Sequence, residues 1–256
     1  SINGLNNGNQ PLKKHNCSLI CNGEIYNYKQ IYSEHQWNAS TDSDCEVILD
    51  LYNLYGFEAV NRLDGVFSFV LFDHNNKKII VSRDPFGVRP LFWSILSDGY
   101  VFASEMKTLL LICEEEKAPI NQFQPGKISI FNMENYGEWF IQSTIKYCHF
   151  SDVKQTENTN ELIVKQLYNA VEKRVLTTEQ PIACLLSGGL DSSLITALVK
   201  HCITKHNIQN RHLQTFSIGL KGGEDLKYAQ IVAKHLGTQH HEVVISEEDF
   251  INAFPE

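Results

Sequence analysis

The chain has 256 residues, of which 43% are hydrophobic and 20% are charged, and this composition excludes a disordered or fibrous protein. Its formal charge of −8 at pH 7 argues against nonspecific binding to nucleic acid. The apolar runs are far too short to cross a bilayer, and the polar N-terminus carries no signal-peptide pattern. We therefore expect no nucleic-acid partner, no membrane partner and a cytoplasmic location.

The seven cysteines are scattered along the chain, and their number is odd. Because a disulfide framework needs regular pairing in an oxidising compartment, we expect free thiols instead. Cys17 and Cys21 lie on one expected strand, where their even spacing is a poor metal-binding geometry. His240 and His241 have no third ligand nearby, so we expect at least one of them to face solvent and no zinc site.

Turn signals and helix signals alternate in the first part of the chain. Residues 1–12 are rich in turn formers and indicate a loop. Asn22-Gly23 stands between short apolar runs, which predicts a hairpin turn at this dipeptide. The segment 43–46 has the pattern of a capping box and predicts a helix that ends at Gly56.

Paired apolar runs follow, each pair joined by a polar turn that indicates a hairpin. A short helix over 105–112 separates the second pair from the third. Hairpins with helices between them predict an α+β domain built on antiparallel sheets over residues 1–150. The expected strand pairs are 66–72 with 78–82, 91–96 with 100–103, and 126–131 with 138–142.

The composition changes at residues 151–160, where Val153 is the only aliphatic residue, and this indicates a linker. A helix over 161–177 comes next, and strands and helices then alternate along residues 161–256. This βαβαβ order predicts a parallel sheet with right-handed crossovers. The expected elements are strands 182–186, 213–220 and 242–245 and helices 192–205 and 226–236.

The segment Ser187-Gly188-Gly189-Leu190-Asp191-Ser192-Ser193 joins an expected buried strand to an expected helix. Its backbone N–H groups and the helix N-terminus favour an anion, and its glycines would let the main chain approach a phosphate without a Cβ in the way. The serine hydroxyls add donors, and the Asp191 carboxylate could hold Mg²⁺. No lysine follows the glycines, so the loop is not of the Walker type. The alternative is an ordinary glycine turn capped by Ser192.

This segment resembles the pyrophosphate loop of the PP-loop ATP-pyrophosphatase superfamily, whose members split ATP between the α and β phosphates. The order of motifs along nearly the whole chain also resembles the glutamine-dependent asparagine synthetase family. The matching segments are 22–28, 43–49, 63–69, 83–91, 103–107, 187–193, 216–220, 225–226 and 235–238.

The resemblance implies a class II glutaminase domain with an N-terminal-nucleophile fold over 1–150, followed by a parallel-sheet ATP-binding synthetase domain over 161–256. The first would hydrolyse glutamine to glutamate and ammonia. The second would use ATP and Mg²⁺ to adenylate the β-carboxylate of aspartate, which the ammonia, arriving through an internal tunnel, then attacks. Glutamine, aspartate and ATP would be the small-molecule substrates. The oligomeric state stays open, a homodimer included.

The resemblance also implies roles for particular residues. The Asn22 side-chain amide and the Gly23 N–H would form an oxyanion hole, and Glu24 and Asp44 would complete the glutamine site by holding the α-ammonium group. The main chains of Leu185 and Ile218 would contact adenosine. Pyrophosphate would be bound by Ser187, Gly188, Gly189, Asp191 and Ser192, with Mg²⁺ on Asp191. Arg83 and Arg89 are expected to be structural.

The chain departs from the family pattern at both ends. The family nucleophile is an N-terminal cysteine, whereas residue 1 is Ser1 in turn-rich sequence, and none of the seven cysteines matches that position. We therefore expect an interior fragment, truncated in both domains and inactive as it stands. Two alternatives stay open. One is a β-lactam-forming synthetase of the same architecture, and the other is a noncatalytic paralogue that acts as a binding subunit.

Overall fold

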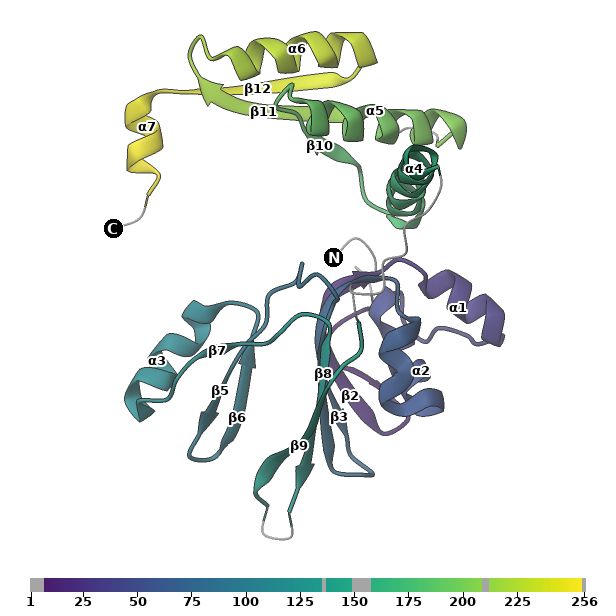
Figure 1. The fold of residues 1–256 in the computed structure, drawn as a ribbon, viewed down its shortest axis with the longest axis vertical. Helices are drawn as coiled ribbons and strands as arrows, with labels where there is room; N and C mark the ends of the chain where they lie inside the picture. Colours follow the sequence, from purple (N-terminus) through teal and green to yellow (C-terminus); the bar gives the residue numbers. More distant parts are fainter. Residues whose placement is uncertain (1–6, 135–136, 149–157, 209–211, 255–256) are drawn as a thin grey trace. The chain divides into compact units, whose positions relative to one another are not determined.

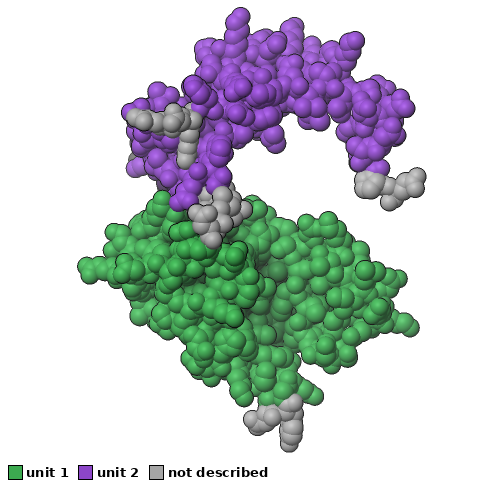
Figure 2. Space-filling view, turned by 180° about the vertical axis from the view of Figure 1, so that it is seen from behind, with its two compact units in different colours: residues 1–155 green, residues 156–256 purple. Residues whose placement is uncertain are grey.

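The computed structural model describes residues 7–134, 137–148, 158–208 and 212–254. The chain divides into two compact units, residues 1–155 and 156–256, which Figure 2 distinguishes by colour. The expected linker 151–160 lies largely outside the described residues. Its last residues already belong to helix α4, which begins at Thr159.

A six-stranded antiparallel sheet in the order β1-β2-β3-β4-β8-β9 forms the centre of unit 1. Neighbouring residues along its strands point to opposite faces, so Ile80 enters one hydrophobic core and Val81 enters another. Its strands are β1 (Leu12–Lys14), β2 (Cys17–Ile25), β3 (Gly65–Asp73), β4 (Lys78–Arg83), β8 (Lys127–Met133) and β9 (Trp139–Lys146).

Helices cover one face of this sheet, and a small second sheet covers part of the other (Figure 1). The helical side holds the larger core, which includes Leu19, Ile48 and Phe67. The small sheet has the order β6-β5-β7. The elements involved are α1 (Tyr28–His35), η1 (Asp44–Glu46), α2 (Val47–Tyr55), η2 (Gly56–Arg62), β5 (Phe92–Leu96), β6 (Gly99–Ala103), α3 (Met106–Glu116) and β7 (Asn121–Gln122).

Unit 2 contains a three-stranded sheet in the order β10-β11-β12, with both pairings parallel as the sequence predicted. Apolar residues of α4 and α5, such as Val175 and Cys202, pack with Leu213 in one core, while Leu186 packs against α6 in another. The elements are α4 (Thr159–Thr177), β10 (Ala183–Leu185), α5 (Leu190–Lys205), β11 (Gln214–Leu220), α6 (Glu224–Leu236), β12 (Gln239–Ile245) and α7 (Glu247–Asn252).

The predicted hairpin at Asn22-Gly23 is wrong. Strand β2 runs through this dipeptide, and its residues pair with β3 from Cys17 to Ile25 without a break. The turn lies upstream, at His15 and Asn16, whose φ angles of 50° and 55° suit the tight turn between β1 and β2. A continuous ladder with β3 therefore outweighs the local turn preference of Asn-Gly.

The predicted capping box over 43–46 is also wrong, because Ser43 makes no side-chain capping bond and the Glu46 carboxylate binds elsewhere. The helix that follows does end at Gly56, whose φ is +59°. The elements β1, α1, η2, β7 and α7 were not predicted. Among the described residues, no helix has the length and hydropathy that a membrane span requires.

Candidate active sites

The first candidate site lies on β2, which approaches β3 unusually closely at a glycine. A Cβ on Gly23 would lie 2.5 Å from the Val66 carbonyl oxygen and 2.8 Å from the Phe67 Cα. On the partner strand, a Cβ on Gly65 would overlap the Glu24 carbonyl oxygen. Because both obstacles are backbone, only glycine fits at either position without moving the strands apart.

The outer edge of β2 carries backbone N–H groups that point away from β3. The Cys21 N–H donates to the Gln10 side-chain oxygen over 2.7 Å, and the Ile25 N–H donates to Asp44 Oδ2 over 2.6 Å. In a strand, alternate N–H groups point the same way. The Gly23 N–H therefore points to this same edge, between those two, and beyond the segment that pairs with β1.

The Asn22 side chain lies on the opposite face of β2 from the helical core. Its Nδ2 donates to Ser104 Oγ over 3.2 Å. It lines a cavity of about 210 Å³, together with Gln10, Ser68 and Phe102. The cavity is bounded by residues of both sheets of unit 1, so tertiary packing rather than local sequence creates it.

Asp44 begins η1 and is almost completely buried, with 2% of its surface exposed. Burial raises the pKa of its carboxyl group, although hydrogen bonds that include the one from Ile25 oppose the rise. Glu24 is likewise buried, at 7% exposure. Gly23, Glu24 and Asp44 thus lie at the same end of β2, and Asp44 is hydrogen-bonded to that strand directly.

Cys45 lies at the same place but is no nucleophile. Its Sγ donates to the Gly23 carbonyl oxygen over 3.7 Å and lies 3.8 Å from Asp44 Oδ2. Hydrogen bonding with Cys21 and burial raise the pKa of Cys45 well above that of a free thiol. A buried, protonated thiol is unreactive. The Cys45 thiol instead donates a hydrogen bond to the main chain of β2. All seven cysteines are free thiols.

Arg83 has the structural environment that we expected. Its guanidinium donates three hydrogen bonds of 2.7 Å to the carbonyl oxygens of Gly87, Arg89 and Phe123. The Asp84 carboxylate binds the same loop by accepting hydrogen bonds from the backbone N–H groups of Phe86, Val88 and Arg89. Arg89 contributes to this arrangement through its main chain.

The second candidate site is the loop between β10 and α5, which lies at the carboxyl edge of the parallel sheet. Ser192 Oγ accepts a 3.3 Å bond from the Ser187 N–H and lies 3.0 Å from Ser187 Oγ. Gly189 is the N-terminal cap residue of α5, and the side chain of Asp191 is exposed in its first turn. Serine hydroxyls, loop N–H groups and a helix N-terminus therefore converge on one exposed rim.

The two glycines of this loop differ in the space that a Cβ would find. Gly188 has a φ of +81°, and a Cβ there would lie 2.5 Å from the Ala229 nitrogen and 2.6 Å from the Tyr228 carbonyl carbon of α6. A Cβ on Gly189 would meet only Ser187 Oγ, at 3.6 Å. Gly188 therefore allows the loop to pack against α6, whereas no contact in the structure requires glycine at Gly189.

A cavity of about 410 Å³ adjoins this loop, and its lining includes Leu185, Ser187 and Ile218. Ser217 and Asp225 also line it, although neither was among the expected site residues. The Ser217 hydroxyl lies 3.2 Å from His240 Nε2, while His240 Nδ1 lies 2.9 Å from Thr215 Oγ1. Only the parallel register of β11 and β12 brings these side chains together.

The expectation that His240 or His241 faces solvent is wrong, because both are half-buried. The His241 ring stacks on Phe216 with centroids 4.8 Å apart. Within the described ranges, no group of three or more His, Cys, Asp or Glu side chains could hold a metal ion. Asp191 alone still suits Mg²⁺, which commonly takes one carboxylate together with waters and substrate phosphates.

Comparison with known proteins bears on both sites. The family model described as a glutamine amidotransferase domain matches residues 1–165, which is more than half of the chain. The chain belongs to this family. In this glutamine amidotransferase chain, residues 162–256 also match the asparagine synthase family model.

Named relatives agree with these matches. The glutamine-hydrolysing asparagine synthetase of Homo sapiens is 36% identical over 271 residues, covering 97% of this chain and 48% of the human protein. Asparagine synthetase 3 of Arabidopsis thaliana is 38% identical over 258 residues, covering 97% and 43%. The chain thus spans about half the length of the curated relatives it matches. Among solved structures, glutamine phosphoribosylpyrophosphate amidotransferase of B. subtilis is 16% identical, covering 92% of this chain and 64% of that one, with a TM-score of 0.44.

Proposed function

We propose that this chain belongs to an ATP-dependent, glutamine-hydrolysing asparagine synthetase. The observation that carries the proposal is that a glutamine amidotransferase match and an asparagine synthase match follow one another along one chain. Each match contains one of the candidate sites described above. In this proposal unit 1 has the N-terminal-nucleophile fold and supplies nitrogen from glutamine, and unit 2 is a PP-loop domain that activates aspartate.

In unit 1, attack on the glutamine side-chain amide moves negative charge onto the amide oxygen. The Asn22 Nδ2 and the Gly23 N–H supply donors for that oxygen, and donors fixed in place stabilise it without reorganising. Glu24 and Asp44 accept hydrogen bonds from the α-ammonium of glutamine. The edge of β2 favours this assignment, because the Gly23 N–H points outward there and Asp44 is fastened beside it.

In unit 2, the loop 187–189 and the N-terminus of α5 bind the β and γ phosphates of ATP, with the Ser187 and Ser192 hydroxyls as further donors. The main chains of Leu185 and Ile218 bind adenosine in the cavity that both residues line. Asp191 would hold Mg²⁺, which supplies positive charge to the phosphates when bound. An oxygen of the aspartate β-carboxylate bonds to the α phosphorus and pyrophosphate leaves; ammonia then displaces AMP, giving asparagine.

Two variants of the protein at its full natural length test this division. D191A should abolish aspartate-dependent exchange between ATP and pyrophosphate and leave glutamine hydrolysis measurable. N22A should lower the kcat of glutamine hydrolysis by about a hundredfold, the usual cost of one oxyanion donor, and leave the exchange unchanged. Equal loss of both activities in either variant would contradict the assignment of separate sites. Exchange without any aspartate dependence would contradict asparagine synthesis.

A further inference from the structure

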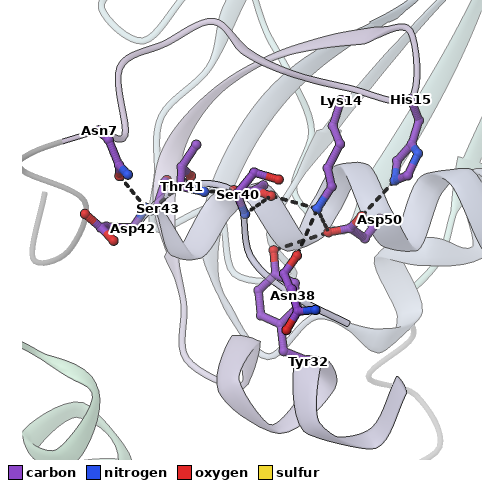
Figure 3. A network of polar contacts seen from close by, with 11 residues as sticks. Asn7, Lys14, His15, Tyr32, Asn38, Ser40, Thr41, Asp42, Ser43 and Asp50 are labelled. Atoms are coloured by element: carbon purple, nitrogen blue, oxygen red, sulfur yellow. Dashed lines mark hydrogen bonds and ion pairs between the residues drawn. The ribbon is translucent and has the colours of Figure 1, made fainter. Parts of the chain in front are cut away.

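A cluster of charged side chains is linked by hydrogen bonds to the segment 40–43, which leads into Asp44 (Figure 3). The Lys14 ammonium, from the end of β1, lies 2.8 Å from Glu46 Oε1, 2.9 Å from Asp50 Oδ2 and 3.4 Å from the Asn38 carbonyl oxygen. These acceptors match the three N–H donors of an ammonium group. The Glu46 and Asp50 side chains are only 2% and 6% exposed, whereas the Lys14 side chain is half-buried, at 19%.

Glu46 has a second set of partners on the segment 40–43. Its Oε1 accepts a 2.9 Å bond from the Ser40 N–H, and its Oε2 accepts a 2.6 Å bond from the Thr41 N–H. The next N–H groups are also held by side chains, that of Asp42 by Asn7 Oδ1 at 2.6 Å and that of Ser43 by Thr41 Oγ1 at 3.2 Å. A segment without regular secondary structure is thus fixed at consecutive N–H groups immediately before Asp44.

The positive charge of Lys14 offsets the cost of burying the Glu46 carboxylate. Burial would raise the pKa of Glu46, but hydrogen bonds from Lys14 and from residues 40–41 outweigh it and lower that pKa below its usual value. Glu46 is therefore ionised at neutral pH, and an ionised carboxylate accepts backbone N–H bonds more strongly than a neutral group. Removing its charge while Lys14 stays would leave the half-buried ammonium with one charged partner fewer.

We infer that Glu46, held by Lys14, is a positioning residue for recognition of the α-ammonium group of glutamine. It touches no substrate. It fixes the segment 40–43 and so sets where the Asp44 carboxylate meets the edge of β2. This inference rests on the proposed function, since it gives Asp44 the ammonium of glutamine as its ligand. Because ion pairing depends steeply on geometry, a shift of this segment weakens the contact even when Asp44 itself is intact.

Binding to two ligands separates positioning from general damage. The ligands are L-glutamine and glutaramate, which is glutamine without its α-amino group, and calorimetry on the full-length protein measures both. E46Q should raise the Kd of L-glutamine about tenfold or more and leave the Kd of glutaramate within about twofold. The matched control is Y32F, which removes the 3.2 Å bond from the Tyr32 hydroxyl to Asp50 in the same cluster without touching Glu46. It should leave both Kd values unchanged.

The outcomes are distinct. If wild-type protein binds L-glutamine no better than glutaramate, the proposed role of Asp44 fails and the inference fails with it. If wild-type protein prefers L-glutamine but E46Q weakens both ligands equally, or neither, the proposed function stands and the inference is overturned. Should E46Q not fold, E46D serves instead: it keeps the charge beside Lys14 but shortens the reach to Ser40 and Thr41. The same selective loss of L-glutamine affinity is expected.

Discussion

The backbone N–H of Ile25 donates a 2.6 Å hydrogen bond to Asp44 Oδ2, which fastens the first residue of η1 to the last residue of β2. The bond orients the carboxylate at the edge of β2. Burial nevertheless raises the pKa of Asp44, because the loss of water around a charged carboxylate outweighs what the hydrogen bonds restore. A carboxyl group with a raised pKa beside a candidate substrate site is a typical functional feature.

Glutamine affinity should therefore depend on pH through Asp44. Only the ionised carboxylate pairs with an ammonium group, so the affinity should rise as pH rises through the raised pKa. D44N should bind L-glutamine about tenfold or more weakly at neutral pH and should lack this dependence. Calorimetric titrations from about pH 4 to about pH 8 measure both effects. An identical acid loss in D44N would contradict the assignment.

Stability provides the control for that variant. A raised folded-state pKa means that the contribution of Asp44 to stability is present below its unfolded-state pKa and is lost as pH rises through the folded-state pKa. At neutral pH the buried charge therefore costs folding free energy, and D44N should unfold at a urea concentration no lower than that of wild-type protein. Loss of glutamine binding in an equally stable variant places the defect in recognition.

The glycines at 188 and 189 should respond differently to alanine. G188A should destabilise unit 2 by about 1–3 kcal/mol or more, because its Cβ would overlap the backbone of α6 and its φ of +81° disfavours a side chain. G189A should fold with nearly unchanged stability, since its Cβ would meet only Ser187 Oγ, at an ordinary contact distance of 3.6 Å. Urea unfolding measures the difference.

ATP binding completes that comparison. Under the proposed function, the Gly189 Cβ stands where a phosphate approaches, so G189A should weaken ATP binding although it folds normally. Equal stability of G188A and wild-type protein would contradict the packing role of Gly188. Unchanged ATP affinity in G189A would contradict the close approach of a phosphate.

Arg83 should prove structural when replaced by lysine. A lysine ammonium does not reach the three carbonyl oxygens that the guanidinium holds at 2.7 Å, so R83K should lose at least about 3 kcal/mol of unfolding free energy in unit 1. R62K is the matched control, because Arg62 is exposed and its guanidinium lies over the Tyr55 ring at 3.8 Å. It should change stability by less than about 1 kcal/mol. Glutamine affinity measured well below the unfolding transition should be unchanged in R83K, and a selective loss of affinity would contradict the structural role.

Patterns that extend along the chain predicted the element types well. The alternation of apolar runs with helices indicated the parallel pairing of β10, β11 and β12, and paired runs with polar turns indicated the strands β3 to β6. Both predictions depend on apolar residues that recur at regular spacing, and this spacing can be read directly from the sequence. The Asn22-Gly23 turn and the capping box failed because each was inferred from a short segment, and distant partners outweighed the local preference.

By itself the sequence determined the order of the motifs and the residue types at both candidate sites, since those types are a matter of chemistry. Only the tertiary structure decided how they are held. It placed Asn22 and Gly23 inside a strand, where the absence of a Cβ on Gly23 lets β3 pack closely. It also packed Gly188 against the backbone of α6. It also placed Lys14 Nζ 2.8 Å from Glu46 Oε1. Contacts between residues distant in sequence depend on packing and strand register, and neither can be predicted from short segments of the sequence.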